Sequence, residues 1–355
     1  MSSVSVVIPC YNYGHFLEEA VRSVLDDQPG VDVRVLIIDD ASPDGSVEVA
    51  RRIAADDPRI EVVAHRENKG NIATFNEGLL EWADGDYCTL LSADDRATPG
   101  ALARARDLLD ARPEVGFVYG HSVWYTDGTT PPPARTKVRG WSVWSGQRWL
   151  EHRFRQAENP ITTPEVVVRT SLQQRVGGYD PQLPKAADME LFMRFAAHGD
   201  VGFLRGVDQA YYRLHGANMS SAVSPLMDLV QRREVFEAVL DRYGHALADV
   251  DGLRESVHRQ LGREALWAAG RVHDRGPLRR SELGRRLMGA GSNPEEGDVE
   301  ELLAYAAECW PEVKRTRLHR RLEAHDSLGP LELLHLVNRK REWWVRRRAW
   351  KYRGY

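Results

Sequence analysis

The chain has 355 residues and a formal net charge of -4 at pH 7, with 42% hydrophobic and 28% charged residues. These values are ordinary for a soluble globular protein of about two domains, and the negative charge argues against nucleic acid as a partner. The three cysteines lie far apart, and no apolar run suits a membrane span or a signal peptide, so we exclude disulfide-scaffold, transmembrane and secreted classes and expect a cytoplasmic protein.

The first 120 residues alternate short apolar runs with segments of helical periodicity. Strands are predicted at the runs rich in β-branched and aromatic residues, which are Val4–Ile8, Val33–Ile38, Ile60–Val63, Tyr87–Leu91 and Val115–Tyr119. Helices are predicted between them, at Phe16–Asp26, Ser46–Ala55, Ile72–Trp82 and Pro99–Asp110. This alternation predicts an α/β fold, with a mostly parallel sheet flanked by helices.

Beyond residue 120 the alternation breaks. Residues 128–134 contain three prolines and predict a loop, and residues 141–154, with three tryptophans, suggest a pocket wall or lid. Regular elements return as a strand at Glu165–Arg169, a turn at Gly177–Pro181, a helix at Asp188–Ala197 and a strand at Ala210–Leu214. From about Pro225 the sequence is helical in pattern, so we predict one domain at residues 1–220 and a helical domain at 221–355.

Polar residues follow each of the first four predicted strands, where ligands bind in an open α/β sheet. These residues are Pro9, Tyr11 and Asn12, then Asp39 and Asp40, then Asn68, Gly70 and Asn76, then Ser92, Asp94 and Asp95. Adjacent carboxylates repel one another unless a cation or separate partners neutralise them, so Asp94 and Asp95 favour a divalent metal site. Each aspartate taken singly also fits a turn or a helix cap. The sequence lacks the GxGxxG, GxxxxGK[ST], HExxH and GxSxG motifs, which argues against a dinucleotide dehydrogenase, a P-loop NTPase, a zinc protease and a serine hydrolase.

Six segments carry a resemblance to a known family. In chain order they are VSVVIPCYNYGHFLEEAVRSVLDD, VLIIDDASPDGS, NKGNIATFNEGL, GDYCTLLSADD, VGGYDPQLPKAADMELFMRFAAHG and YYRLHGANMS. Together, over about residues 3–220, they resemble the inverting family 2 glycosyltransferases of GT-A fold. The resemblance implies a Rossmann-like GT-A domain. It also implies transfer of a sugar from a UDP-, dTDP- or GDP-linked donor to a hydroxyl of a glycan, a lipid-linked acceptor or a small molecule.

The resemblance also implies roles for individual residues. The expected donor site comprises Pro9, Tyr11, Asn12, Asp39, Asp40, Asn68, Gly70, Asn76 and Asp94. Asp94, Asp95 and His215 match the residues that hold Mg²⁺ or Mn²⁺ against the donor diphosphate, and Asp188 matches the catalytic base. The chain departs from the family pattern at Ser92, where many members carry the first Asp of DxD, and at Ala187, where Glu is common.

Alternatives remain open for several of these residues. Asp188 also fits the N-cap of the following helix, and His215 fits a solvated loop histidine. Trp124, Trp141 and Trp144 lie where the acceptor region of the family begins, but tryptophans fill cores as well as stack on sugars.

The rest of the chain carries two further expectations. Residues 339–355 combine eight basic residues with three tryptophans, which fits a helix at the inner face of a membrane or one packed on its own domain. The helical extension also offers a homodimer interface.

The rival functions are a non-catalytic nucleotide- or carbohydrate-binding module and a sugar-1-phosphate nucleotidyltransferase, although the latter needs a Gly-rich basic loop that PCYNYGHFLEE does not provide.

Overall fold

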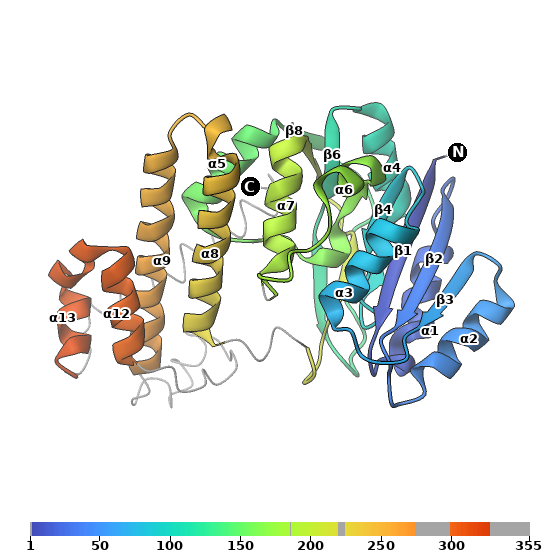
Figure 1. Ribbon diagram of the computed structural model, residues 1–355, viewed down its shortest axis with the longest axis horizontal. Helices are drawn as coiled ribbons and strands as arrows, with labels where there is room; N and C mark the ends of the chain where they lie inside the picture. Colours follow the sequence, from blue (N-terminus) through green and yellow to red (C-terminus); the bar gives the residue numbers. More distant parts are fainter. Residues whose placement is uncertain (1, 185, 219–223, 274–298, 327–355) are drawn as a thin grey trace. The chain divides into compact units, whose positions relative to one another are not determined.

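The computed structural model describes residues 2–184, 186–218, 224–273 and 299–326 (Figure 1). The described residues fall into two compact units, one made of residues 2–150 and 159–218 and the other of residues 151–158, 224–273 and 299–326. The predicted domain boundary between residues 220 and 221 lies outside the described residues, and so does the basic tail at 339–355.

An eight-stranded sheet in the order β3-β2-β1-β4-β9-β6-β10-β8 forms the centre of the first unit. Its strands are β1 (Ser3–Cys10), β2 (Asp32–Asp39), β3 (Ile60–Ala64), β4 (Tyr87–Leu90), β6 (Val115–Tyr119), β8 (Trp141–Trp144), β9 (Val167–Arg169) and β10 (Asp200–Leu204). Neighbouring strands are parallel in the pairs β1–β2, β2–β3, β1–β4 and β6–β10, whereas β8 and β9 run antiparallel to their neighbours. The predicted α/β class with a mostly parallel sheet is therefore confirmed.

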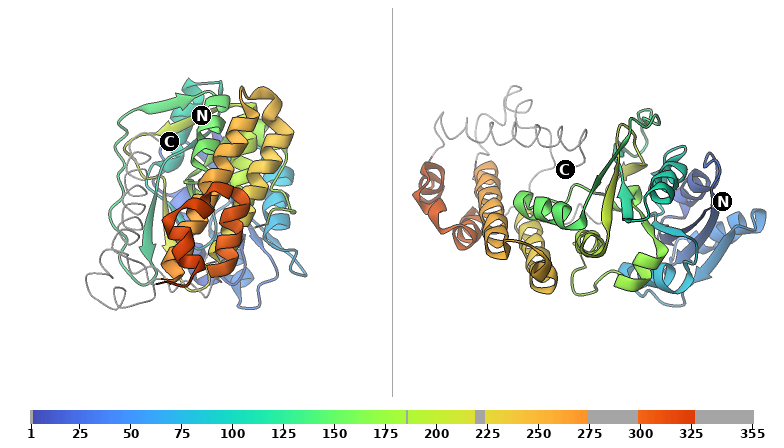
Figure 2. Two further views of the ribbon diagram at one scale, coloured as in Figure 1. Left: turned by 90° about the vertical axis from the view of Figure 1, so that its left-hand side faces the viewer. Right: turned by 90° about the horizontal axis from the view of Figure 1, so that it is seen from above.

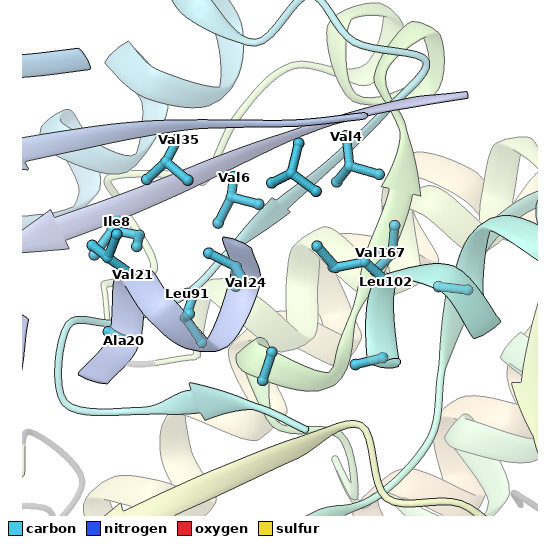
Figure 3. Close-up of a cluster of buried hydrophobic side chains, with 14 of the residues drawn as sticks. Val4, Val6, Ile8, Ala20, Val21, Val24, Val35, Leu91, Leu102 and Val167 are labelled. Atoms are coloured by element: carbon cyan, nitrogen blue, oxygen red, sulfur yellow. The ribbon is translucent and has the colours of Figure 1, made fainter. Parts of the chain in front are cut away.

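Helices connect the strands of this sheet. They are α1 (Gly14–Leu25), α2 (Ser46–Asp56), α3 (Asn71–Asn76), the π-helix η1 (Glu77–Trp82), α4 (Ala101–Ala111), α5 (Gly146–Gln156), the short η2 (Thr163–Glu165), α6 (Thr170–Val176) and α7 (Ala187–His198). Right-handed crossovers place such helices against the faces of a parallel sheet, so its central strands are apolar on both sides. In Figure 3, Ala20, Val21 and Val24 of α1 pack under Val6 and Ile8 of β1.

A second sheet of three strands, in the order β5-β11-β7, lies in the same unit. It consists of β5 (Arg96–Ala97), β7 (Ser122–Thr126) and β11 (Ala210–Leu214). Strand β11 runs parallel to β7 and antiparallel to β5, which directly follows the turn after β4. This pairing places the residues at the end of β11 beside that turn.

The segment at 141–154, predicted as a pocket wall or lid, forms the edge strand β8 and most of helix α5. Trp149 is only 3% exposed, and its ring meets Phe117 edge-on at 5.9 Å between centroids. Its indole N–H donates to the Tyr119 hydroxyl at 3.3 Å. This tryptophan therefore belongs to the core, where its one polar group finds a partner.

The described part of the second unit is helical, as the pattern after Pro225 predicts. It contains α8 (Pro225–Tyr243), η4 (Gly244–Ala246), α9 (Val250–His273), α12 (Val299–Cys309), η5 (Pro311–Arg315) and α13 (Arg317–Glu323). Helix α9 packs against α8, α12 and α13, which Figure 2 shows as neighbours in this unit. The rest of the predicted helical domain, at residues 221–223, 274–298 and 327–355, lies outside the described residues. Within the described ranges, none of the helices combines the length and apolar character needed to cross a bilayer.

Candidate active site

At the ends of β1 and β2, two buried acceptor atoms have no hydrogen-bond partner in the part of the chain that the structure describes. Asp39 accepts the Ser42 amide at 3.1 Å through Oδ2, but its Oδ1 is buried without a hydrogen-bond partner among the described residues. Asn12 Oδ1 is also buried without a hydrogen-bond partner among the described residues. The backbone N–H of Asn12 donates to Ser42 Oγ at 3.0 Å. An unsatisfied buried acceptor costs about 1–3 kcal/mol, so both atoms favour a ligand that carries N–H or O–H groups. Tyr11, which is 46% exposed, and the half-buried Pro9 lie next to them in the chain.

Asp40 differs from Asp39 because groups of this chain occupy both of its carboxylate oxygens. It accepts Nδ1 of His65 at 2.7 Å and the amides of Lys69 and Gly70 at 2.8 and 3.0 Å. Burial raises the pKa of Asp40, but these hydrogen bonds outweigh that effect and hold the pKa below its usual value. Asn68 Nδ2 donates to the Asp40 carbonyl at 3.1 Å. Asp40 therefore fixes the loop 68–70, and no motif in the sequence points to its partner His65.

Asn76 is engaged with a different segment. Its Nδ2 donates to the carbonyl of Tyr179 at 2.9 Å, and the Tyr179 amide donates to its Oδ1 at 2.7 Å. The neighbouring Gly178 leaves no room for a side chain, because a Cβ there would lie 2.0 Å from Asn76 Oδ1. Arg194 donates to the carbonyls of Val176 and Gly178, both at 2.7 Å. The amide of Asn76 thus ties α3 to the turn before α7.

Asp94 and His215 meet where β4 and β11 end. Asp94 Oδ2 lies 3.0 Å from His215 Nε2, and the His215 ring meets Tyr13 edge-on at 5.3 Å. Asp95 has another partner, because its Oδ1 accepts the Arg213 amide at 2.9 Å. Burial and the neighbouring charge of Asp94 raise the pKa of Asp95 well above its usual value.

The described residues contain no group of three or more His, Cys, Asp or Glu side chains arranged to hold a metal ion. Asp94 and His215 nevertheless provide two adjacent ligands, one oxygen and one nitrogen. A divalent ion bound by few protein groups commonly takes further ligands from substrate phosphates and water. This pair fits such an ion, whereas Asp95 is held by the backbone of β11.

Asp188 lies in the first turn of α7 and is partly accessible to solvent. The helix has Ala186 as its N-cap residue, so the alternative prediction of Asp188 as the N-cap is wrong. Burial raises the pKa of Asp188 to about 6, although hydrogen bonds from the Met189 amide and Asn159 oppose that shift. A carboxylate that titrates near neutral pH is suited to accept a proton. Its neighbour Glu190 is buried and is ion-paired with an arginine at 2.6 Å.

The tryptophans expected near an acceptor lie on two different sheets. Trp124, on β7, is 48% exposed and stacks on Tyr212 of β11 with ring centroids 4.8 Å apart. Trp141 and Trp144 belong to the edge strand β8, where Trp141 is 38% exposed and Trp144 stacks on Phe203 at 6.3 Å. The structure therefore does not bring the three tryptophans together on one strand or one sheet.

Comparison with known proteins gives one family and several relatives. Residues 5–172 match the family described as glycosyl transferase family 2. The chain is 34% identical over 126 residues to the putative teichuronic acid biosynthesis glycosyltransferase TuaG of Bacillus subtilis, a match that covers 36% of this chain and 49% of TuaG. It is 29% identical over 225 residues to an uncharacterized glycosyltransferase of Nostoc, covering 62% of this chain and 67% of the relative. The chain thus spans about half the length of TuaG.

The fold is also similar to solved structures. The crystal structure of Staphylococcus aureus TarS 1–349 in complex with UDP superimposes with a TM-score of 0.57 and 15% identity, covering 91% of this chain and 88% of that chain. At this identity the likeness concerns the fold.

Proposed function

The chain belongs to glycosyl transferase family 2 and has the GT-A fold, and we propose that it transfers a sugar from a nucleotide diphosphate donor to an acceptor hydroxyl, with metal assistance and inversion of the anomeric centre. The name of TuaG refers to teichuronic acid, which supports polysaccharide assembly as the setting. The TarS crystals contain UDP or UDP-GlcNAc, so UDP-linked sugars are the first donors to test.

The observation that carries the proposal is the pair of unpartnered acceptors at the ends of β1 and β2. A nucleobase and its ribose present N–H and O–H groups, and these are the groups that Asp39 Oδ1 and Asn12 Oδ1 lack among the described residues. A ligand bound at this edge of the sheet would satisfy both atoms. Ligands of open α/β sheets bind outside the carboxyl ends of the strands, where both residues lie.

Asp94 and His215 would hold the metal ion and the diphosphate of the donor. A divalent ion supplies positive charge to the departing diphosphate when it is bound there. The contact of 3.0 Å between Asp94 Oδ2 and His215 Nε2 keeps both ligands at one place before any ion arrives. This preorganisation reduces the rearrangement that binding requires.

Asp188 would accept the proton of the attacking hydroxyl. Its Oδ1 accepts the Met189 amide at 2.7 Å, whereas among the described residues Oδ2 has only a long contact of 3.4 Å with Asn159 and is the oxygen available to an acceptor. A base that draws the hydroxyl toward the face opposite the leaving diphosphate leads to inversion in a single displacement. This stereochemistry is part of the proposal.

The test is release of the nucleotide diphosphate from a panel of UDP-, dTDP- and GDP-sugars, with Mn²⁺ and with EDTA. We expect slow hydrolysis of at least one donor that depends on the metal. Donor binding without turnover across the panel would favour a non-catalytic binding module instead. The anomeric configuration of the first product, read by NMR, then tests inversion.

A further inference from the structure

We propose that Arg213 is a positioning residue that fixes Asp94 for binding the metal and diphosphate of the donor, an inference that rests on the proposed function. Arg213 lies on β11, two residues before His215. No motif in the sequence points to a role for this arginine.

Arg213 holds the turn after β4 at two points. Its amide donates to Asp95 Oδ1 at 2.9 Å, and its side-chain Nε donates to the carbonyl of Asp94, also at 2.9 Å. The first bond uses the backbone and persists whatever side chain stands at position 213. The second depends on the guanidinium, and it fixes the peptide from which the Asp94 carboxylate projects.

The Arg213 guanidinium is held in place by two carboxylates and two aromatic rings. Its two terminal nitrogens donate to Asp127 Oδ1 at 2.8 Å and to Glu19 Oε2 at 2.6 Å. Its Cζ lies 4.2 Å from the ring centroid of Phe16 and 5.2 Å from that of Tyr125, within the range of cation–π attraction. The Arg213 side chain is only 8% exposed and its hydrogen bond to the Asp94 carbonyl is buried, whereas the side chains of Asp127 and Glu19 are 42% and 55% exposed. A group held this firmly can impose its geometry on the Asp94 carbonyl.

Strand β11 therefore positions both expected metal ligands, Asp94 and His215. Nε of Arg213 determines where the Asp94 backbone lies, and His215 contacts the Asp94 carboxylate at 3.0 Å from the same strand end. Groups that orient metal ligands without touching the metal commonly change its affinity when they are replaced.

The test is Arg213→Lys, with Mn²⁺ affinity measured in the presence of saturating UDP by electron paramagnetic resonance of free Mn²⁺. Lysine keeps the positive charge, but its single ammonium group cannot reproduce the planar set of donors to Asp94, Asp127 and Glu19. We expect Mn²⁺ affinity to fall by about 10- to 100-fold. UDP binding measured by calorimetry without metal should be unchanged.

Arg96→Lys is the matched control. Arg96 lies over the same Tyr125 ring at 5.2 Å and 3.6 Å from the same Glu19, but it makes no hydrogen bond to Asp94 in the described part of the chain. Its replacement should leave Mn²⁺ affinity at the wild-type value. Thermal unfolding of both variants shows whether any loss comes from the fold, since a merely structural role lowers the melting temperature without changing affinity well below it.

The outcomes separate the two proposals. Wild-type protein that binds no Mn²⁺ with UDP contradicts the metal assistance in the proposed function. If Arg213→Lys binds Mn²⁺ as tightly as the wild type and Asp94→Asn does not bind it, the proposed role of Arg213 is wrong. The proposed function is not affected by that result. If Arg213→Lys does not fold, the double variant Glu19→Gln with Asp127→Asn loosens the guanidinium instead. Mn²⁺ affinity weaker than wild type in that variant supports the role, and unchanged affinity overturns it.

Discussion

At the scale of single residues, the two adjacent aspartates at the end of β2 differ in their hydrogen bonding. Asp40 accepts three hydrogen bonds from the chain, whereas Asp39 accepts one and keeps a buried oxygen without a partner among the described residues. One carboxylate shapes a loop, and the other is available to a ligand. A pair that looks uniform in sequence therefore has two functions.

Replacing each aspartate should separate these functions. Asp40→Asn removes the negative charge and replaces one of the two accepting oxygens by an NH₂ donor, which faces an N–H group, so it should lower the free energy of unfolding by about 2–3 kcal/mol. Asp39→Asn should leave that free energy nearly unchanged but weaken UDP binding by about tenfold or more, the equivalent of about 1.4 kcal/mol. Urea unfolding and calorimetry with UDP measure the two effects. Equal effects of both variants on UDP binding at equal stability would contradict the division.

Asp188→Asn should leave donor binding intact while sugar transfer falls by about 10²-fold or more, since the amide cannot accept the proton. In the wild type, kcat/KM should decline as the pH falls through about 6, the pKa to which burial raises Asp188. Because burial raises its pKa to about 6, Asp188 binds its proton more tightly in the folded state than in the unfolded chain. Protonated Asp188 therefore stabilises the fold at low pH. This contribution to stability is lost as the pH rises through about 6.

The same linkage predicts that Asp188→Asn raises the melting temperature relative to wild type at about pH 8 and that the gain disappears toward about pH 4. Melting curves across this range check the sign. A pH–rate profile that stays flat below pH 6 would remove Asp188 as the base.

At the scale of elements, the connection between α3 and the turn before α7 is the feature that a motif could not reveal. Asn76 fits a pattern expected near the nucleotide, yet its amide pairs with the backbone of Tyr179, more than 100 residues further along the chain. The carbonyls of Val176 and Gly178 in the same turn also accept Arg194. Asn76 therefore joins α3, in the segment proposed to bind the donor, to the turn before α7, which carries the proposed base.

Asn76→Ala removes both bonds and leaves the amide and carbonyl of Tyr179 without these partners. We expect a loss of about 2–3 kcal/mol in stability and a lower kcat at nearly constant donor affinity, because the turn leads to the helix that carries Asp188. Asn76→Asp is the matched variant, since it can still accept the Tyr179 amide and should lie between alanine and wild type. A rise in donor Kd without a change in kcat would instead place Asn76 at the nucleotide.

At the scale of the whole molecule, the sequence was sufficient for the architecture of the sheet but not for the state of each site residue. Apolar runs indicated β1, β2, β3, β4 and β6 because strands covered on both faces contain few polar residues. Strands β7 and β10 were missed because neither is a continuous apolar run: most of β7 (SVWYT) is accessible to solvent, and β10 (DVGFL) begins with a charged residue and contains a glycine. Contacts between distant segments determine which oxygen of Asp39 is left without a partner among the described residues. They also determine which backbone groups form hydrogen bonds with Arg213 and Asn76. No local sequence pattern encodes such contacts.

Binding of UDP with Mn²⁺ should stabilise the folded chain, because a ligand specific for the folded state adds about 2.7 kcal/mol at a hundredfold excess over its Kd. The melting temperature should rise with both present, rise less with UDP and EDTA, and lose its dependence on Mn²⁺ in Asp94→Asn. Calorimetry or dye-based melting curves give the three values. An equal rise with EDTA would exclude a metal contribution to donor binding.

Strand β11 has a practical consequence for anyone expressing the first unit of this protein alone. The family match ends at residue 172, but the carboxylate on α7 and the imidazole that meets Asp94 come later in the chain, the latter at residue 215. A fragment trimmed to the match would retain Asn12 and Asp39, which we propose to contact the nucleotide, but it would lose the proposed base and the imidazole. The shortest expression fragment worth purifying therefore extends through Asn218, whose side chain donates to the carbonyl of Arg213 at 3.0 Å.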